Sequence, residues 1–365
     1  MTALPTKKLE AWRYTDLRAL ERLSFGAVPA AALPALPEFA GPIVVFANGR
    51  MSAPLAAPLG DGREFAPVQE HGPQSLAHIN AEQAQDGLSL SVPAGIDGGA
   101  LLMLSHNAGE TPFAAHPRHR VTLGDNARLT LIELVKGEGV YWHNPVADIA
   151  LHGGAVLTHI RLQQESTAAF NTTLIRANVA AGAAYEHFTA TIGAKLSRTE
   201  LHVSLLGEGA RADLNAAQLL RGEQHGDFTA VVRHAAPNCA SRQTVKSVLA
   251  DDAHGVFQGR IEVAKGAQKT DGYQMSRALL LSERATMDIK PELEIFADDV
   301  KCSHGATIGA LDAEQLFYLR SRGINEPEAR AMLIHAFLEE AFAPVTDEAA
   351  HKLLIEAIGT WWTTP

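Results

Sequence analysis

Cysteine is nearly absent from this chain of 365 residues, which contains only two, Cys239 and Cys302. Two cysteines cannot form a disulfide framework, so the chain is not a disulfide-stapled secreted domain, and we expect a reducing compartment. Basic residues are also in the minority, with 31 Lys and Arg against 41 Asp and Glu and a net charge of −10. An acidic chain without a Lys/Arg cluster repels phosphate groups, which argues against binding to nucleic acid or to a membrane surface.

Long apolar runs are missing as well. None approaches the ~20 residues that a membrane helix needs. The N-terminal stretch MTALPTKKLEAWRYTDL has no apolar segment after its basic residues, so it does not resemble a signal peptide. These features predict a soluble, cytoplasmic protein. Its hydrophobic content of 46% is enough for a sizeable core, and its length suggests about two domains.

Residues 1–100 are predicted to form a mixed N-terminal region. Residues 10–22 have a helix-like pattern, and the Ala/Pro tract AVPAAALPALPEFAGP that follows is typical of a linker or extended segment. The next stretch, GPIVVFANGR, predicts a short buried strand and an Asn-Gly turn.

Residues 101–310 are dominated by apolar–polar alternation, which predicts strands. A turn of small residues interrupts them and recurs at intervals of 27 or 28 residues, ending at Ala127, Ala155, Ala183 and Ala210, and a further Gly-Ala pair ends at Ala267. A repeat of this length indicates stacked supersecondary units, and too little helical pattern lies between the turns for a βα repeat. A mainly β fold with a β-helix core fits best. A β-sandwich is the alternative, because turn spacing alone does not fix topology.

Residues 311–365 are predicted to form three helices in a small bundle. The first begins after a cap at Asp312 and stops at Gly323. The second begins with Asn325 as cap and Glu328 placed as in a capping box. The third, TDEAAHKLLIEAIG, has acidic residues at its start, which suits the helix dipole.

The stretch DDVKCSHGATIG carries the first candidate site. Cys302 and His304 are two residues apart, so on a strand they share one face, and thiolate and imidazole both suit iron, iron–sulfur clusters and zinc. The spacing alone favours the plainer interpretation of a buried cysteine beside a surface histidine. Two ligands also do not hold a cluster, which normally takes four.

A second polar group lies in EQHGDFTAVVRHAAPNCASRQ and consists of His225, Asp227, Thr229, His234 and Cys239. The first three alternate along a predicted strand, so they are expected to share one face. A metal or acid/base site is one interpretation, and a polar ladder on a β-solenoid surface is the favoured one. The remaining histidines are expected mostly on the surface. GEGARA formally matches a dinucleotide-binding motif, but it coincides with the repeated turn, and without a phosphate-binding loop we do not expect the chain to hydrolyse ATP.

The string ADDVKCSHGATIGALDAEQLFYLRSRGI resembles the C-terminal signature of the SufB/SufD family of iron–sulfur cluster assembly scaffold proteins. The likeness is dense over about residues 196–330, and EAWRYTDLRAL near the N-terminus resembles the opening of SufD members. SufB members typically carry CSHEAT and more cysteines, whereas this chain has CSHGAT and two. The resemblance is therefore to the SufD branch.

That resemblance implies a right-handed parallel β-helix followed by a C-terminal helical domain, in a scaffold that is not an enzyme. It implies pairing with SufB through the β-helix ends, and a transient iron–sulfur cluster at the interface to which Cys302 and His304 contribute. The ATPase SufC would dock on the C-terminal helices, where the candidate contact or packing residues are Leu316, Phe317, Leu333 and Phe337. Some complexes of the family are thought to use reduced flavin, but no flavin site is evident in the sequence.

Two other classes of function compete with the scaffold. The first is a β-solenoid enzyme that uses a groove lined by His225 and Asp227. The second is a self-contained metal protein that uses Cys302, His304 and further histidines. Because the ends of a β-helix expose unpaired strand edges, some pairing is expected in any case, including a homodimer of the isolated chain.

Overall fold

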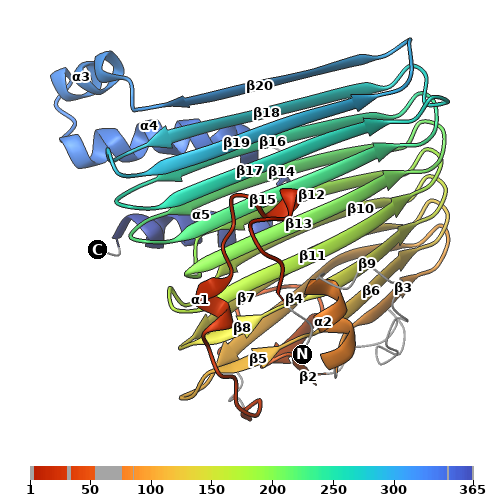
Figure 1. Ribbon diagram of the computed structural model, residues 1–365, viewed down its shortest axis with the longest axis horizontal. Coiled ribbons are helices and arrows are strands. Elements are labelled where there is room, and N and C mark those ends of the chain that lie inside the picture. The colour runs from red at the N-terminus through yellow and green to blue at the C-terminus, as the bar shows by residue number, and fades with distance from the viewer. Residues whose placement is uncertain (1–3, 31–33, 54–75, 85, 343–344, 364–365) are drawn as a thin grey trace.

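The computed structural model describes residues 4–30, 34–53, 76–84, 86–342 and 345–363, and its centre is a β-helix (Figure 1). The chain winds in coils of two strands, one in each of two ten-stranded sheets that face one another. Among the described strands, all pairs are parallel except β1–β2. The predicted parallel β-helix is therefore confirmed, and the β-sandwich alternative is wrong.

The strands of each sheet follow one another in spatial order along the axis. Sheet B contains β2 (Arg50–Ala53), β1 (Ile43–Ala47), β4 (Asp97–Ala108), β7 (Arg128–Glu138), β10 (Val156–Gln164), β12 (Ala184–Thr191), β14 (Arg211–Leu220), β16 (Ala240–Leu249), β18 (Asp271–Leu280) and β20 (Lys301–Gly309). Sheet A contains β3 (Ser89–Val92), β6 (Arg118–Leu123), β9 (Val146–Leu151), β11 (Phe170–Val179), β13 (Leu196–Leu205), β15 (His225–His234), β17 (His254–Val263) and β19 (Thr286–Ile295), with β5 (Phe113–Ala115) and β8 (Tyr141–His143) beside this path. The β-helix thus takes in β1, β3 and the start of β4, all before residue 101.

The repeated turn marks the entry to successive strands of sheet B. The residue before each turn alanine has a positive φ that glycine or asparagine adopts at little cost, as at Asn126 (57°) and Gly154 (68°). The alanines that follow are fully buried and stack from coil to coil: Ala127, Ala155, Ala183 and Ala210. In the later coils the register places Cys239 and then Thr270 at this position, so Ala267 lies three residues before the equivalent place.

The core lies between the two sheets. Inward-facing residues of alternating strand positions form it, among them Leu129, Leu157, Tyr185 and Phe228. Each such buried side chain stabilises the fold by roughly 1.5–3 kcal/mol.

The C-terminal segment forms α3 (Ala313–Ser321), α4 (Glu326–Phe342) and α5 (Glu348–Thr363). The predicted caps are confirmed: the Asp312 carboxylate accepts from the backbone N–H of Glu314 at 2.8 Å, and the Asn325 side chain accepts from that of Glu328 at 2.9 Å. The predicted bundle is wrong. Apolar residues of α4 and α5 pack on the outer face of sheet B because that face presents its own apolar row (Figure 1).

The N-terminal segment crosses the outer face of sheet A (Figure 1). Residues 10–22 hold only two short helices, η1 (Glu10–Trp12) and α1 (Arg18–Glu21), instead of one continuous helix. The break occurs because Thr15 turns toward the sheet and bonds to it. A third short helix, α2 (Leu76–Gln83), packs with Trp12 and Leu20 in one apolar cluster on this face.

Candidate functional site

Cys302 and His304 lie on β20, the terminal strand of sheet B. Cys302 is paired in register with Gly272 of β18 and His304 with Gln274. Gln274 is buried inside the β-helix, and register partners in a sheet point to the same face. Both candidate ligands therefore project from the inner face of the last coil, and no further coil of the described chain follows it.

The thiol of Cys302 is half-buried. It packs beside Ile261 and Val263 and lies close over Gly272, where an added Cβ would stand 3.3 Å from Sγ. Burial raises the pKa of the Cys302 thiol; a backbone hydrogen bond at Gly272 lowers it, and the Asp271 carboxylate raises it. The thiol therefore keeps its proton at neutral pH.

His304 is exposed, in contrast to Cys302. Its imidazole can therefore reach a ligand beyond the end of the β-helix without unfolding the strand. Within the described residues, no three His, Cys, Asp or Glu side chains come close enough together to hold a metal ion. Cys302 and His304 thus present two candidate ligands from one face of β20.

The end of the β-helix at β19 and β20 is open. In the described part of the chain the two strands pair only with β17 and β18, so each leaves one backbone edge unpaired (Figure 1). Apolar side chains are exposed beside these edges, with Ile295 at 38%, Phe296 at 68% and Ile308 at 49% exposure. A long edge with exposed apolar side chains is a site for pairing with another chain.

A second exposed apolar surface lies between α3 and α4. A groove of about 800 Å³ is lined by residues that include Phe317, Tyr318, Leu319 and Leu333. Phe317 is 73% exposed, and Leu316 and Leu333 are half-buried.

Phe337 differs from the residues of this groove. It packs against the apolar cluster of sheet B, with the Lys246 ammonium 4.7 Å from its ring centre.

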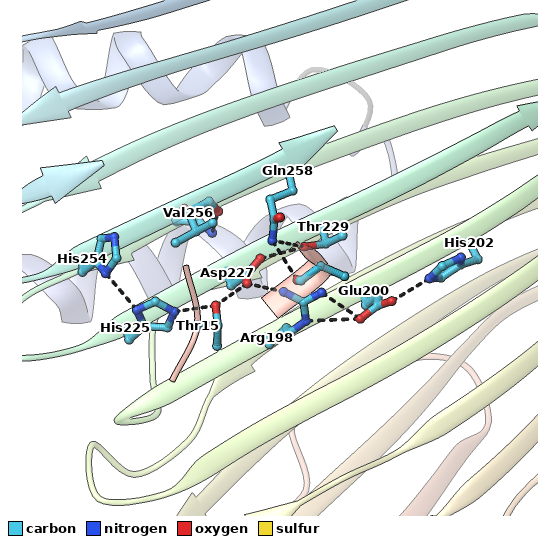
Figure 2. A network of polar contacts seen from close by, with 12 residues as sticks. Thr15, Arg198, Glu200, His202, His225, Asp227, Thr229, His254, Val256 and Gln258 are labelled. Carbon is cyan, nitrogen blue, oxygen red and sulfur yellow. Dashed lines mark hydrogen bonds and ion pairs between the residues drawn. The ribbon is translucent and has the colours of Figure 1, made fainter. Parts of the chain in front are cut away.

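The pair His225 and Asp227 lies beneath the N-terminal segment (Figure 2). Thr15 bonds to His225 Nε2 at 2.9 Å and donates to the Asp227 carboxylate, which also pairs with Arg198. Thr229 donates to Asp227 Oδ1 at 2.8 Å. The predicted shared face is confirmed, and the pair anchors the N-terminal segment, so a substrate would reach it only by displacing that segment.

The network extends in both directions along the face (Figure 2). His225 Nδ1 lies 3.1 Å from His254 Nδ1. On the other side, Arg198 pairs with Glu200 at 2.9 Å, and Glu200 with His202 at 2.6 Å. Burial raises the pKa of Glu200, but the Arg198 charge and His202 outweigh it and bring it down to about 2. The Trp12 ring stacks on Arg198, 4.2 Å from its guanidinium.

A buried polar cluster that the sequence pattern does not reveal lies inside the β-helix. Glu133 pairs with His159 at 3.1 Å and with Arg161 at 3.1 Å, and Glu165 lies 3.2 Å from His143. The expectation that the remaining histidines are mostly on the surface holds for part of the described set, since His152, His202, His335 and His351 are exposed. Six others are buried: His116, His119, His143, His159, His187 and His234. The buried histidines occupy inward-facing positions on their strands. The alternation of apolar and polar residues does not by itself show which of the two faces of a strand points inward.

The fold and the site define a parallel β-helix with a thiol and an imidazole at an unpaired end. A family model, the SufBD core domain of SUF system FeS cluster assembly, matches residues 104–337. The chain is 33% identical to the iron-sulfur cluster assembly protein SufD of Escherichia coli over 98% of its own length and 89% of the relative's. It is 31% identical to an iron-sulfur cluster assembly SufBD family protein of Synechocystis, over 92% of this chain and 83% of the relative.

A third relative, the chloroplastic protein ABCI7 of Arabidopsis thaliana, is 36% identical over 72% of this chain and 58% of that protein. The chain belongs to the SufBD family of iron–sulfur cluster assembly proteins, and it is SufD-like. No described helix is long and apolar enough to span a membrane.

Proposed function

We propose that this chain is a cytoplasmic scaffold subunit, without a catalytic role of its own, of a complex that builds iron–sulfur clusters. The observation that carries the proposal is the position of Cys302 and His304 together on the inner face of a terminal strand that has one edge unpaired in the described chain. Two ligands are too few for a cluster. A partner at the open end supplies the others.

The partner proposed for this end is SufB, the cysteine-richer relative. Pairing along the edges of β19 and β20 would satisfy their free backbone groups and cover Phe296 and Ile308, which are exposed in the single chain. A second copy of this chain offers the same edges, so a homodimer is expected when SufB is missing.

The cluster is the cargo of this site, and its stay is transient. A half-buried thiol with a raised pKa gives up its proton only as the metal binds, and proton uptake then helps to release the metal again. His304 adds a neutral ligand that is exposed to a partner.

The energy for assembly is proposed to come from the ATPase SufC, docked in the groove between α3 and α4. Phe317 is the central contact, since an aromatic side chain exposed to 73% has no packing role in the described chain and suits an interface anchor. Leu333 lines the same groove, and Leu316 is the preceding residue of α3.

The test uses cells in which the only copy of this chain is His304→Ala. We expect the variant to fold, because His304 is exposed, and cluster-dependent enzymes to lose most of their activity. The matched control is Ser303→Ala, which changes the exposed neighbour on the opposite face of β20. Full activity of the cluster enzymes in the His304→Ala strain would refute the assigned role.

A further inference from the structure

Three inward-facing polar residues occupy the same place in the last three strands of sheet B. Gln243 of β16 is the register partner of Gln274 of β18, and Gln274 is the register partner of His304 of β20. Neighbouring strands lie about 4.8 Å apart, and register partners share a face. The three side chains therefore form one ladder that runs along the axis and ends at the open end.

The ladder has a direction. Gln274 Nε2 donates to Gln243 Oε1 at 3.4 Å. Gln274 is 1% exposed, and its Oε1 atom is buried without a hydrogen-bond partner. The side-chain nitrogen of Gln274 is used in the hydrogen bond to the preceding coil. Its side-chain oxygen is therefore available to accept a hydrogen bond from the following coil, which contains His304.

The ladder does not serve the stability of the β-helix. On the preceding strand, β14, the register partner of Gln243 is Leu214, which cannot form a hydrogen bond through its side chain. The Nε2 atom of Gln243 is buried without a hydrogen-bond partner. Gly259 of the opposite sheet leaves room for the two amides, since a Cβ there would stand 2.9 Å from Gln243 Oε1 and 2.9 Å from Gln274 Nε2. Buried amides with unsatisfied atoms destabilise a fold relative to apolar side chains of the same shape. The two buried amides are therefore expected to have a role at the open end of the β-helix, where the ladder reaches His304.

We propose that Gln274 is a positioning residue for His304, an inference that rests on the proposed function of His304 as a ligand. When the exposed His304 side chain turns toward the ladder, one ring N–H donates to Gln274 Oε1. The bond fixes the tautomer and leaves the lone pair of the other ring nitrogen directed out of the open end. The ligand is thereby oriented before the partner's ligands arrive, which reduces the ordering cost of assembly.

The test is nitrogen NMR of the full-length chain labelled with ¹⁵N-histidine, at about pH 8, where an unperturbed imidazole is neutral. The His304 signals are assigned by their loss in His304→Ala. In Gln274→Leu we expect the ratio of the two neutral tautomers to change about fivefold, the ratio that one net hydrogen bond sustains. Gln274→Glu retains an acceptor at this place and is expected to favour the same tautomer as the wild type.

The matched control is Gln243→Leu, which removes the amide that accepts from Gln274 and leaves Gln274 Oε1 in place. We expect its tautomer ratio to equal that of the wild type. An unchanged ratio in Gln274→Leu, or an equal change in Gln243→Leu, would overturn the positioning role.

A cellular measurement separates this inference from the proposed function. If His304→Ala cells assemble clusters normally, the proposed function fails whatever the tautomer ratio is. If His304→Ala cells are impaired, Gln274→Leu cells are expected to lose cluster-enzyme activity severalfold while the purified variant is at least as stable as the wild type. Normal activity in Gln274→Leu cells beside impaired His304→Ala cells would contradict the positioning role.

Discussion

Cys239 occupies, one coil later, the position that Ala210 occupies in the stack of turn alanines. The register of β14 and β16 makes the two residues equivalent, and both are buried. The Cys239 thiol donates to the backbone oxygen of Gly207 at 3.3 Å. Cys239 is therefore a small packing residue, and the two cysteines of the chain have different roles.

The first prediction compares the two cysteines. We expect Cys239→Ala to change the free energy of unfolding by about 1 kcal/mol or less, because the stack already accepts alanine there. Cluster-enzyme activity in cells is expected to stay at the wild-type level in Cys239→Ala and to fall in Cys302→Ala. Equal losses in the two strains would contradict the assignment of the site to Cys302.

The second prediction concerns the network under the N-terminal segment. Asp227→Asn removes the carboxylate that pairs with Arg198, which is 1% exposed. We expect the free energy of unfolding in urea to fall by about 3 kcal/mol, because a buried charge loses a partner. The control is His202→Ala, which removes only the outer, exposed contact to Glu200 in the same network and is expected to cost less than about 1 kcal/mol. Similar costs for the two variants would show that the buried pair does not anchor the segment.

The third prediction is a loss of stability in mild acid. Burial lowers the pKa of His116, His119, His225 and His234 to about 4 in the folded chain, whereas an unfolded histidine has a pKa of about 6.5. Between these values the unfolded chain binds more protons, so the free energy of unfolding falls as the pH falls from about 6.5 to about 4.

Urea titrations at about pH 7 and about pH 5 measure this dependence. In His234→Gln we expect the slope near pH 5 to be smaller by about 1 kcal/mol per pH unit, the share of one histidine. Stability that is equal or greater at the lower pH would contradict the buried, neutral state of these side chains.

The fourth prediction separates contact from packing on the C-terminal helices. Phe317→Asp is expected to abolish copurification of the ATPase while the free energy of unfolding stays within about 0.5 kcal/mol, because Phe317 is exposed. Phe337→Ala is expected to cost about 2 kcal/mol, because its ring packs on the cluster over sheet B. ATPase binding that survives Phe317→Asp would remove the groove from the proposed interface.

Much of the fold could be predicted because the local chemistry repeats. Each coil needs a residue with positive φ followed by a small buried residue. The turns that end at Ala127, Ala155, Ala183 and Ala210 therefore showed the length of the repeat. The caps at Asp312 and Asn325 were equally local.

The misses share a physical cause, which is that the partner lies far away in sequence. Glu133 pairs with His159 and so offsets the cost of burying that side chain inside the β-helix. The two residues come together only because successive coils stack on one another. The apolar residues of α4 predict that one face of the helix is buried but not which surface covers it. The packing of this face on sheet B was therefore not predicted. Thr15 breaks the N-terminal helix to reach Asp227, more than 200 residues away in the chain. The pair Cys302 and His304 was singled out by its spacing and assigned a role through the family resemblance, while the ladder behind His304 needed the register of the strands.

The central claim is that the open end with Cys302 and His304 is completed by a partner. The most direct test is an anaerobic pull-down of the tagged full-length chain from its own cytosol, with wild type and a β20 edge variant, Ile308→Asp, side by side. We predict that the wild type recovers a cysteine-richer relative and a P-loop ATPase, and that Ile308→Asp loses the relative and keeps the ATPase. Recovery of the wild-type chain alone would contradict the scaffold account.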